Sequence, residues 1–180
     1  MNTIALFGGS FDPPHVGHEA VVKALQKLSY IDKIVIMPTF LNPFKHSFDA
    51  PAVLRLKWLK SIFLDDNNVL VDDYEVSLGK KVPTIQTVTH LLKSYDKIFL
   101  VIGADNLANL EQWYHFKELK EKVTFIVASR ENIKISKAFI SLKVEEDISS
   151  SALRENIDEN KLPKKCAKEI AQYYKENNEQ

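Results

Sequence analysis

The chain has 180 residues, enough for one sizeable domain and too few for two ordinary ones, so we expect a single domain over residues 1–180. Its 24 Lys and Arg balance its 24 Asp and Glu, which excludes a general electrostatic attraction to nucleic acid or to an anionic membrane. The single cysteine, Cys166, excludes an internal disulfide and multi-cysteine metal clusters. Without a signal-peptide pattern or an apolar run of roughly 18 residues, a cytoplasmic protein is expected.

Short apolar segments alternate with segments of helical periodicity. The predicted strands are 4–7, 34–37, 69–71, 98–102 and 123–128, and the predicted helices between them are 19–28, 52–63, 84–92 and 116–119. After Ser129 the pattern weakens into a sixth strand at 139–144 and helices near 152–156 and 164–174. The alternation predicts a Rossmann-like α/β fold: an open parallel sheet with helices on both faces, followed by a small C-terminal helical segment.

In such sheets, ligands bind outside the carboxyl ends of the strands, where the strand order reverses. A 3-2-1-4-5 order places this point between the first and fourth strands. The first strand ends at the unusual loop 8–15, and the fourth ends at Gly103-Ala104-Asp105. We therefore expect both loops to face one crevice.

The loop after the first strand has the composition of an anion site. Gly8 and Gly9 allow close approach of a ligand to the backbone, and the following helix start offers unpaired N–H groups. His15 and His18 are three residues apart and share one face of that turn. The pattern favours a phosphate clamp over a plain turn with two surface histidines. A metal site would need further ligands, which do not follow at suitable spacing.

A second candidate segment begins at Ile148. Hydroxyls of Ser149, Ser150 and Ser151 stand at a predicted helix start, and Arg154 follows about one turn later. Such a segment binds phosphate through N–H groups and a guanidinium. Taken alone, it also fits an ordinary serine N-cap with a solvated arginine.

Residues 8–18 resemble the signature of the nucleotidylyltransferase superfamily, including its HxGH element, and residues 148–154 resemble its second motif, ISSTxxR, with Ser151 replacing Thr. The resemblance implies catalytic roles for His15, His18 and Arg154, and ATP accompanied by Mg²⁺, with no metal held by the protein itself. The implied ATP-binding residues are Gly8, Gly9, Ser10, Phe11, His15, His18, Gly103, Asp105, Ile148, Ser149, Ser150, Ser151 and Arg154.

Three further segments are similar to the nicotinate-nucleotide branch of that superfamily: Asn42 to Lys45, Pro83 to Thr87, and Gly103 to Leu107 followed by Trp113-Tyr114. This similarity implies transfer of the ATP adenylyl group to nicotinate mononucleotide. The implied mononucleotide-binding residues are Lys45, Thr84, Trp113, Tyr114 and Arg130. Two positions depart from the branch pattern: Gln86 replaces an Asp, and Glu131 follows Arg130 where Gly or Pro is common.

Several alternatives remain open at this stage. Trp113 and Tyr114 are suited to stack on a pyridine ring, but their spacing fits core packing beside Leu110 equally well. The acceptor could instead be nicotinamide mononucleotide or phosphopantetheine. An NAD-binding oxidoreductase is disfavoured, because the glycine loop is not GxGxxG and no acidic residue ends the second strand. A non-catalytic nucleotide-binding module and a homo-oligomer are also compatible with the sequence.

Overall fold

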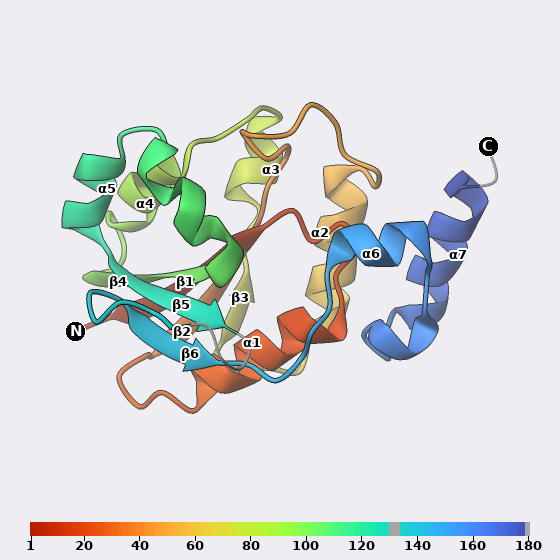
Figure 1. Ribbon diagram of the computed structural model, residues 1–180, viewed down its shortest axis with the longest axis horizontal. Coiled ribbons are helices and arrows are strands. Elements are labelled where there is room, and N and C mark those ends of the chain that lie inside the picture. The colour runs from red at the N-terminus through yellow and green to blue at the C-terminus, as the bar shows by residue number, and fades with distance from the viewer. Residues whose placement is uncertain (130–133, 179–180) are drawn as a thin grey trace.

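The protein is described by a computed structural model over residues 1–129 and 134–178 (Figure 1). In that part of the chain, six parallel strands form one sheet with the order β3-β2-β1-β4-β5-β6. The strands are β1 Thr3–Gly9, β2 Lys33–Pro38, β3 Val69–Val71, β4 Lys97–Gly103, β5 Thr124–Ser129 and β6 Ile140–Lys143. The Rossmann-like prediction and its strand order are confirmed, and the sixth strand extends the sheet beside β5.

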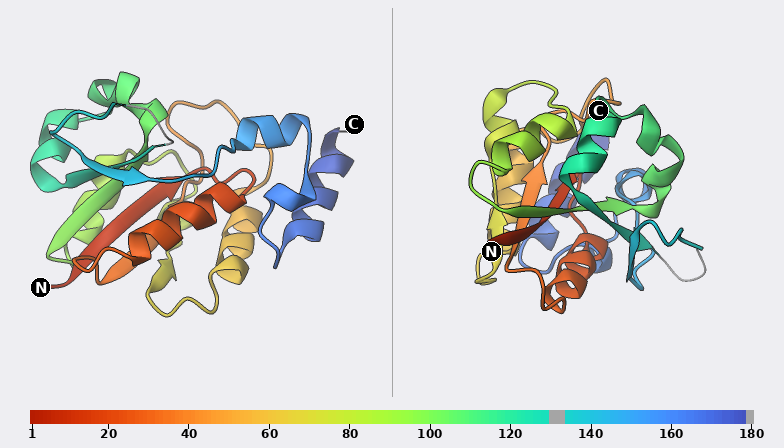
Figure 2. Two further views of the ribbon diagram at one scale, coloured as in Figure 1. Left: turned by 60° about the horizontal axis from the view of Figure 1, so that its bottom comes forward. Right: turned by 90° about the vertical axis from the view of Figure 1, so that its left-hand side faces the viewer.

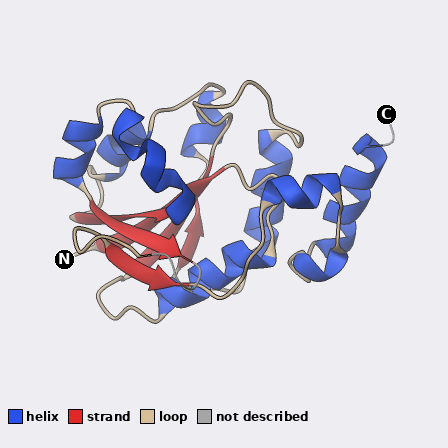
Figure 3. Ribbon diagram, in the orientation of Figure 1, coloured by secondary structure: helices blue, strands red, loops and turns tan. Residues whose placement is uncertain are grey.

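Helices follow most strands, as the periodicity predicted (Figure 3). The α-helices are α1 Val16–Gln26, α2 Ala52–Ile62, α3 Tyr74–Leu78, α4 Thr84–Leu91, α5 Phe116–Lys122, α6 Ser150–Glu155 and α7 Ala167–Asn178, and the 3₁₀ helices are η1 Ala104–Gln112 and η2 Glu159–Lys161. The sequence did not predict α3 or η1. The first is too short to show a periodicity, and the second has the tighter 3₁₀ geometry.

The two faces of the sheet are covered by different helices (Figure 2). Along β1, Ala5 and Phe7 join the core beneath α1 and α2, whereas Ile4 and Leu6 join the core beneath α4 and α5. This alternation follows from the two-residue period of a strand, and burial on both faces explains why β1 reads as a continuous apolar run. The functional loops emerge at the carboxyl ends of the central strands.

The C-terminal helical segment packs on α2, at the opposite end of the molecule from the N-terminus (Figure 1). The fully buried Trp58 of α2 contacts the ring of Tyr174 at a centroid distance of 6.1 Å. Cys166 is buried beside Trp58, and burial raises the pKa of its thiol. A raised pKa keeps the thiol protonated and unreactive. No helix in the described ranges is long and apolar enough to span a membrane.

Candidate phosphate and acceptor site

The two histidines predicted as a clamp lie at the start of α1, but they form a stack. Their ring centroids are 3.7 Å apart with an interplanar angle of 22°. Gly17 makes this possible, because a Cβ there would lie 2.9 Å from the His15 ring. The glycine of the HxGH element is thus required by a close approach, which lets the His15 imidazole fold back over the first turn.

The backbone N–H of His15 fixes the orientation of the His18 ring by donating to its Nδ1 at 3.1 Å. In the neutral ring the proton is therefore on Nε2. Burial, and then the neighbouring His15, lower the pKa of His18 well below its ordinary value. The ring also packs edge-on against Phe11, at 4.7 Å, so it is less exposed than a first-turn position suggested. His18 is consequently a neutral, oriented N–H donor near pH 7.

Asp12 connects three segments of the chain through hydrogen bonds. Its buried carboxylate accepts hydrogen bonds from the backbone N–H groups of Asp49 (2.8 Å) and Ala50 (2.9 Å) and from the hydroxyl of Tyr174 on α7. These bonds join the loop after β1 to the loop before α2 and to the C-terminal helix. Across the described ranges, no group of three or more His, Cys, Asp or Glu side chains is arranged to hold a metal ion.

The second motif meets the first although more than 130 residues separate them. Ser149 caps α6 by accepting from the backbone N–H of Ala152 at 3.1 Å, as an N-cap serine would. The Ser150 hydroxyl donates to the carbonyl oxygen of Pro13 at 2.9 Å, and Arg154 donates to that of Asp12 at 2.6 Å. The two segments thus form one surface at the carboxyl edge of β1.

Arg154 has two further side-chain partners in this surface. Its Nη2 lies 3.3 Å from Ser151 Oγ, and its Nε lies 3.1 Å from a carboxylate oxygen of Asp49. Desolvation, and then the charge of Arg154, lower the pKa of Lys45, and the carboxylates of Asp12 and Asp49 oppose both effects. Lys45 thus lies within electrostatic range of Arg154, and it is not among the residues that line the neighbouring cavity. The Asp49 carboxylate that pairs with Arg154 is 57% exposed.

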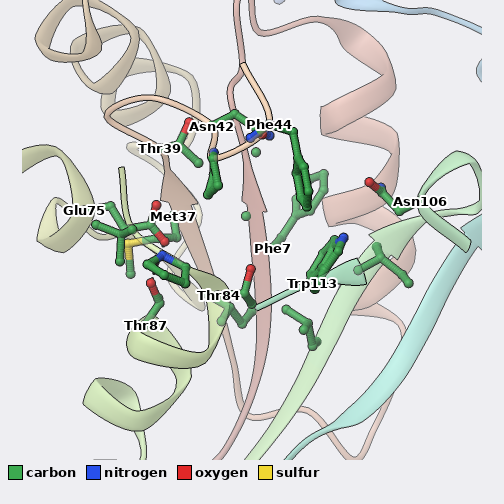
Figure 4. Close-up of a pocket in the computed structure, with 18 of the residues that line it drawn as sticks. Phe7, Met37, Thr39, Asn42, Phe44, Glu75, Thr84, Thr87, Asn106 and Trp113 are labelled. Carbon is green, nitrogen blue, oxygen red and sulfur yellow. Dashed lines mark hydrogen bonds between the residues drawn. The ribbon is translucent and has the colours of Figure 1, made fainter. Parts of the chain in front are cut away.

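A cavity of about 440 Å³ opens beside this surface between β1, β2, β4, α3, α4 and η1 (Figure 4). Its lining includes six predicted residues: Gly8, Gly9, Thr84, Gly103, Trp113 and Tyr114. Trp113 also packs against the core that contains Leu110, so this residue can both line the cavity and pack in the core. The Tyr114 side chain is 64% exposed. The cavity is mostly apolar and therefore suited to a flat ring.

Other predicted residues lie around these two regions. Asp105 is exposed and lies beside Gly103. A larger residue at position 103 would place its Cβ against the Asp105 carboxylate. Ile148 is half-buried against the α1 core. The carbonyl of Ser10 accepts a hydrogen bond from the buried Arg55 guanidinium at 2.5 Å. Arg130 lies outside the described residues.

Sequence reasoning missed one ionisable residue that lines the cavity, Glu75 on α3. Its side chain is buried, and its Oε1 accepts a hydrogen bond from the Thr87 hydroxyl at 2.6 Å. Burial raises the pKa of Glu75 to about 7, against the opposing hydrogen bond from Thr87. No motif marks this residue, because its burial is created by segments distant in the sequence. Gln86, the departure noted above, bonds to the Tyr74 hydroxyl at 3.3 Å and does not line the cavity.

Comparisons with known proteins agree with this geometry. Residues 6–156 match the family model described as cytidylyltransferase-like. The chain is 64% identical to a protein of Sulfurimonas denitrificans described as a probable nicotinate-nucleotide adenylyltransferase, over 98% of this chain and 97% of that protein. A protein of Nitratiruptor sp. with the same description is 47% identical over 96% and 98%.

Among solved structures, the fold resembles that of Plasmodium falciparum nicotinic acid mononucleotide adenylyltransferase complexed with NaAD. The TM-score is 0.77 with 22% identity, over 99% of this chain and 97% of that one. At this identity the likeness concerns the fold.

Proposed function

We propose that this chain, which belongs to the cytidylyltransferase-like family and within it to the nicotinate-nucleotide adenylyltransferases, transfers the adenylyl group of ATP to nicotinate mononucleotide, releasing pyrophosphate. The observation that carries the proposal is that two distant segments of the chain meet in one surface. Ser150 and Arg154 bond to the backbone of the loop that leads into the His15–His18 stack. Beside that surface lies a cavity suited to the acceptor's ring.

The reaction is an in-line displacement at the α-phosphorus of ATP. An oxygen of the mononucleotide 5′-phosphate forms the new P–O bond, and the bond to the pyrophosphate oxygen breaks. The nucleophile is already an anion, so the protein needs to align the reactants and stabilise the charge that develops. No covalent enzyme intermediate is required.

The histidines and the second motif have distinct roles in this proposal. His18 donates its Nε2 proton in a hydrogen bond to the α-phosphate, and its neutral, fixed ring makes this donor available without reorganisation. His15 supports that ring by stacking and completes the donor pair. Arg154 releases the Asp49 carboxylate and binds the pyrophosphate end of ATP in its place, with Ser151 beside it. The glycines at 8, 9 and 103 admit the nucleotide close to the backbone.

The acceptor is assigned to the cavity. Trp113 offers an indole face to the pyridine ring, and Thr84, the first residue of α4, lines the wall where the N–H groups of a helix start are available for the carboxylate. Tyr114 borders the opening. In this proposal Lys45, which is within electrostatic range of Arg154, binds the mononucleotide phosphate.

Mg²⁺ is proposed to arrive with ATP and to neutralise charge on its phosphate oxygens. The residues present fit this mode: the carboxylate of Asp12 is occupied by three hydrogen bonds, which leaves it unsuited to build a protein cage for the ion. We also propose that the enzyme works in the cytoplasm with these small molecules as its partners.

The proposal is tested with a panel of acceptors and α-labelled ATP in the presence of Mg²⁺. Label should enter a dinucleotide with nicotinate mononucleotide, more slowly with nicotinamide mononucleotide, and not with phosphopantetheine. Pyrophosphate should not appear without an acceptor. Efficient labelling of phosphopantetheine, or comparable ATP cleavage without an acceptor, would contradict the proposal.

A further inference from the structure

Glu75 places an ionisable carboxyl group inside the cavity assigned to the acceptor. Its side chain is only 6% exposed, yet it belongs to the cavity lining. Figure 4 shows Glu75, Met37 and Thr87 on one side of the cavity, with Trp113 and Phe44 on the other. A ring stacked on Trp113 therefore has Glu75 in the opposite wall of the same enclosed space.

Among the described residues, the side chains around Glu75 give its carboxylate one hydrogen bond and no resolved interaction with a cation. The strands behind it contribute apolar side chains to the cavity lining, namely Leu6, Met37, Leu100 and Ile102. Helix α4 contributes the uncharged Thr87, whose hydroxyl is the hydrogen-bond donor to Glu75. The carboxylate of Asp72 raises the pKa of Glu75 further, because it disfavours a second negative charge.

Four titratable groups on the elements around α3 have interactions of their own. Arg55 on α2 donates to the carbonyl oxygens of Ser10, Ala50, Thr39 and Phe40. Lys81, in the segment between α3 and α4, reaches the carbonyl oxygen of Pro43 at the rim. Tyr74 and His90 stack on each other at 3.8 Å, and they line a separate surface pocket.

We propose that an anionic pyridine carboxylate binds in this cavity only together with a proton on Glu75, so that Glu75 determines how the preference for the acid over the amide changes with pH. The inference rests on the proposed function and deepens it. Two carboxylates in one low-dielectric cavity cannot both be ionised at low cost. Protonated Glu75 can donate a hydrogen bond to the substrate's carboxylate, whereas ionised Glu75 can accept one from a carboxamide.

The direction of the pH effect follows from the free protein. The pKa of Glu75 is about 7 before the anion enters. Below this pH the carboxyl is already protonated and the acid binds without proton uptake. Above it, each binding event must take up one proton, and the affinity for the acid falls by up to about tenfold per pH unit. The amide mononucleotide carries no carboxylate and does not require this proton.

The experiment compares kcat/KM for nicotinate and nicotinamide mononucleotides between pH 6 and 9. Both carry the same 5′-phosphate, so its titration cancels in the ratio. In the wild type, the acid-to-amide ratio should fall above pH 7, whereas in Glu75→Gln it should be flat. The same slope in both proteins, or a flat wild-type ratio, would overturn the inference. Glu118→Gln, an exposed change on α5 outside the cavity lining, should retain the wild-type slope.

A binding measurement separates this inference from the proposed function. Titration with nicotinate mononucleotide at pH 8, in two buffers of different ionisation enthalpy, should show uptake of about one more proton in the wild type than in Glu75→Gln. Equal uptake by the two proteins would overturn the inference even if turnover were normal. Conversely, failure to adenylylate either mononucleotide would remove the proposed function, whatever the proton uptake.

Asp72→Asn provides a second variant in case Glu75→Gln does not fold. The change removes the charge that raises the pKa of Glu75 but retains an oxygen that can accept the Tyr74 backbone N–H, at 2.8 Å in the wild type. The pKa of Glu75 should therefore fall, and the acid-to-amide ratio should begin to fall at a lower pH than in the wild type. An unchanged or higher midpoint would contradict the inference.

Discussion

The proposed phosphate surface, formed by His15, His18, Ser150 and Arg154, and the proposed acceptor cavity lie side by side at the carboxyl edge of one sheet, but they are built differently. The phosphate surface is fixed by hydrogen bonds between distant segments: Asp12 alone is bonded to the loop before α2, to α6 and to α7. The cavity is bordered by exposed aromatic side chains, with Phe44 61% and Tyr114 64% exposed. We infer that the reaction chemistry is preorganised, whereas the acceptor site is completed when the acceptor binds.

The largest expected effect is at the phosphate surface. His18→Ala removes an oriented donor to a charged transition state and should lower kcat by about 10² to 10³. The measurement is kcat at saturating substrates together with a denaturation midpoint, because the ring also packs on Phe11. His90→Ala, whose ring stacks on Tyr74 outside the cavity, is the matched control and should keep its kcat. A His18→Ala enzyme within twofold of the wild type would remove His18 from the mechanism.

The next effect should be confined to the cavity. Trp113→Ala should raise the acceptor KM roughly 5- to 150-fold, which corresponds to a loss of about 1 to 3 kcal/mol of stacking free energy. The KM for ATP should change far less, because ATP phosphates bind at the other region. If Trp113 only packs in the core, the variant should instead lose about 3 to 5 kcal/mol of folding free energy and impair both KM values together. Both constants and an unfolding midpoint should be measured.

A third effect concerns how the stability of the protein changes with pH. The folded-state pKa of Glu75, about 7, lies above its ordinary value of 4.5. The contribution of Glu75 to stability is therefore fully present below pH 4.5 and is lost as the pH rises through 7. Relative to Glu75→Gln, the wild type should lose up to about 3 kcal/mol of unfolding free energy between pH 4.5 and 8. If the unfolding free energies of the two proteins changed with pH in the same way, Glu75 would not be buried as described.

The sequence predicted the fold well because local signals determine it. The continuous apolar run of β1 and the apolar spacing of α1, α2 and α4 are present in short windows, and a parallel sheet with right-handed crossovers leaves few topologies. The 3₁₀ spacing of η1 and the five residues of α3 provide no such signal. Both elements line or border the cavity, so the acceptor end was the harder part to predict.

The sequence named candidate site residues but not their contacts. The HxGH and serine–arginine motifs indicated one candidate site, and the structure brings the two segments together. The histidine stack depends on the space above Gly17, and the role of Asp12 depends on Tyr174, 162 residues away. Glu75 has no motif because its perturbed pKa arises from burial by other segments. Long-range packing of this kind leaves no local pattern.

The smallest expected effect tests whether the phosphate surface is fully preorganised. Asp49 pairs with Arg154 at 3.1 Å, and its side chain is 57% exposed. An exposed ion pair contributes only about 0.2 to 1 kcal/mol, so Asp49→Asn should lower the KM for ATP by no more than about fivefold. The backbone N–H of Asp49 still bonds to Asp12, so the loop should remain in place. Lys57→Gln, which removes a similarly exposed pair with Glu169 on α7, is the control and should leave the KM for ATP unchanged. A raised KM for ATP in Asp49→Asn would mean that Asp49 holds Arg154 in its binding position. A lowered KM would mean that Asp49 occupies the place of the phosphate and must leave before ATP can bind.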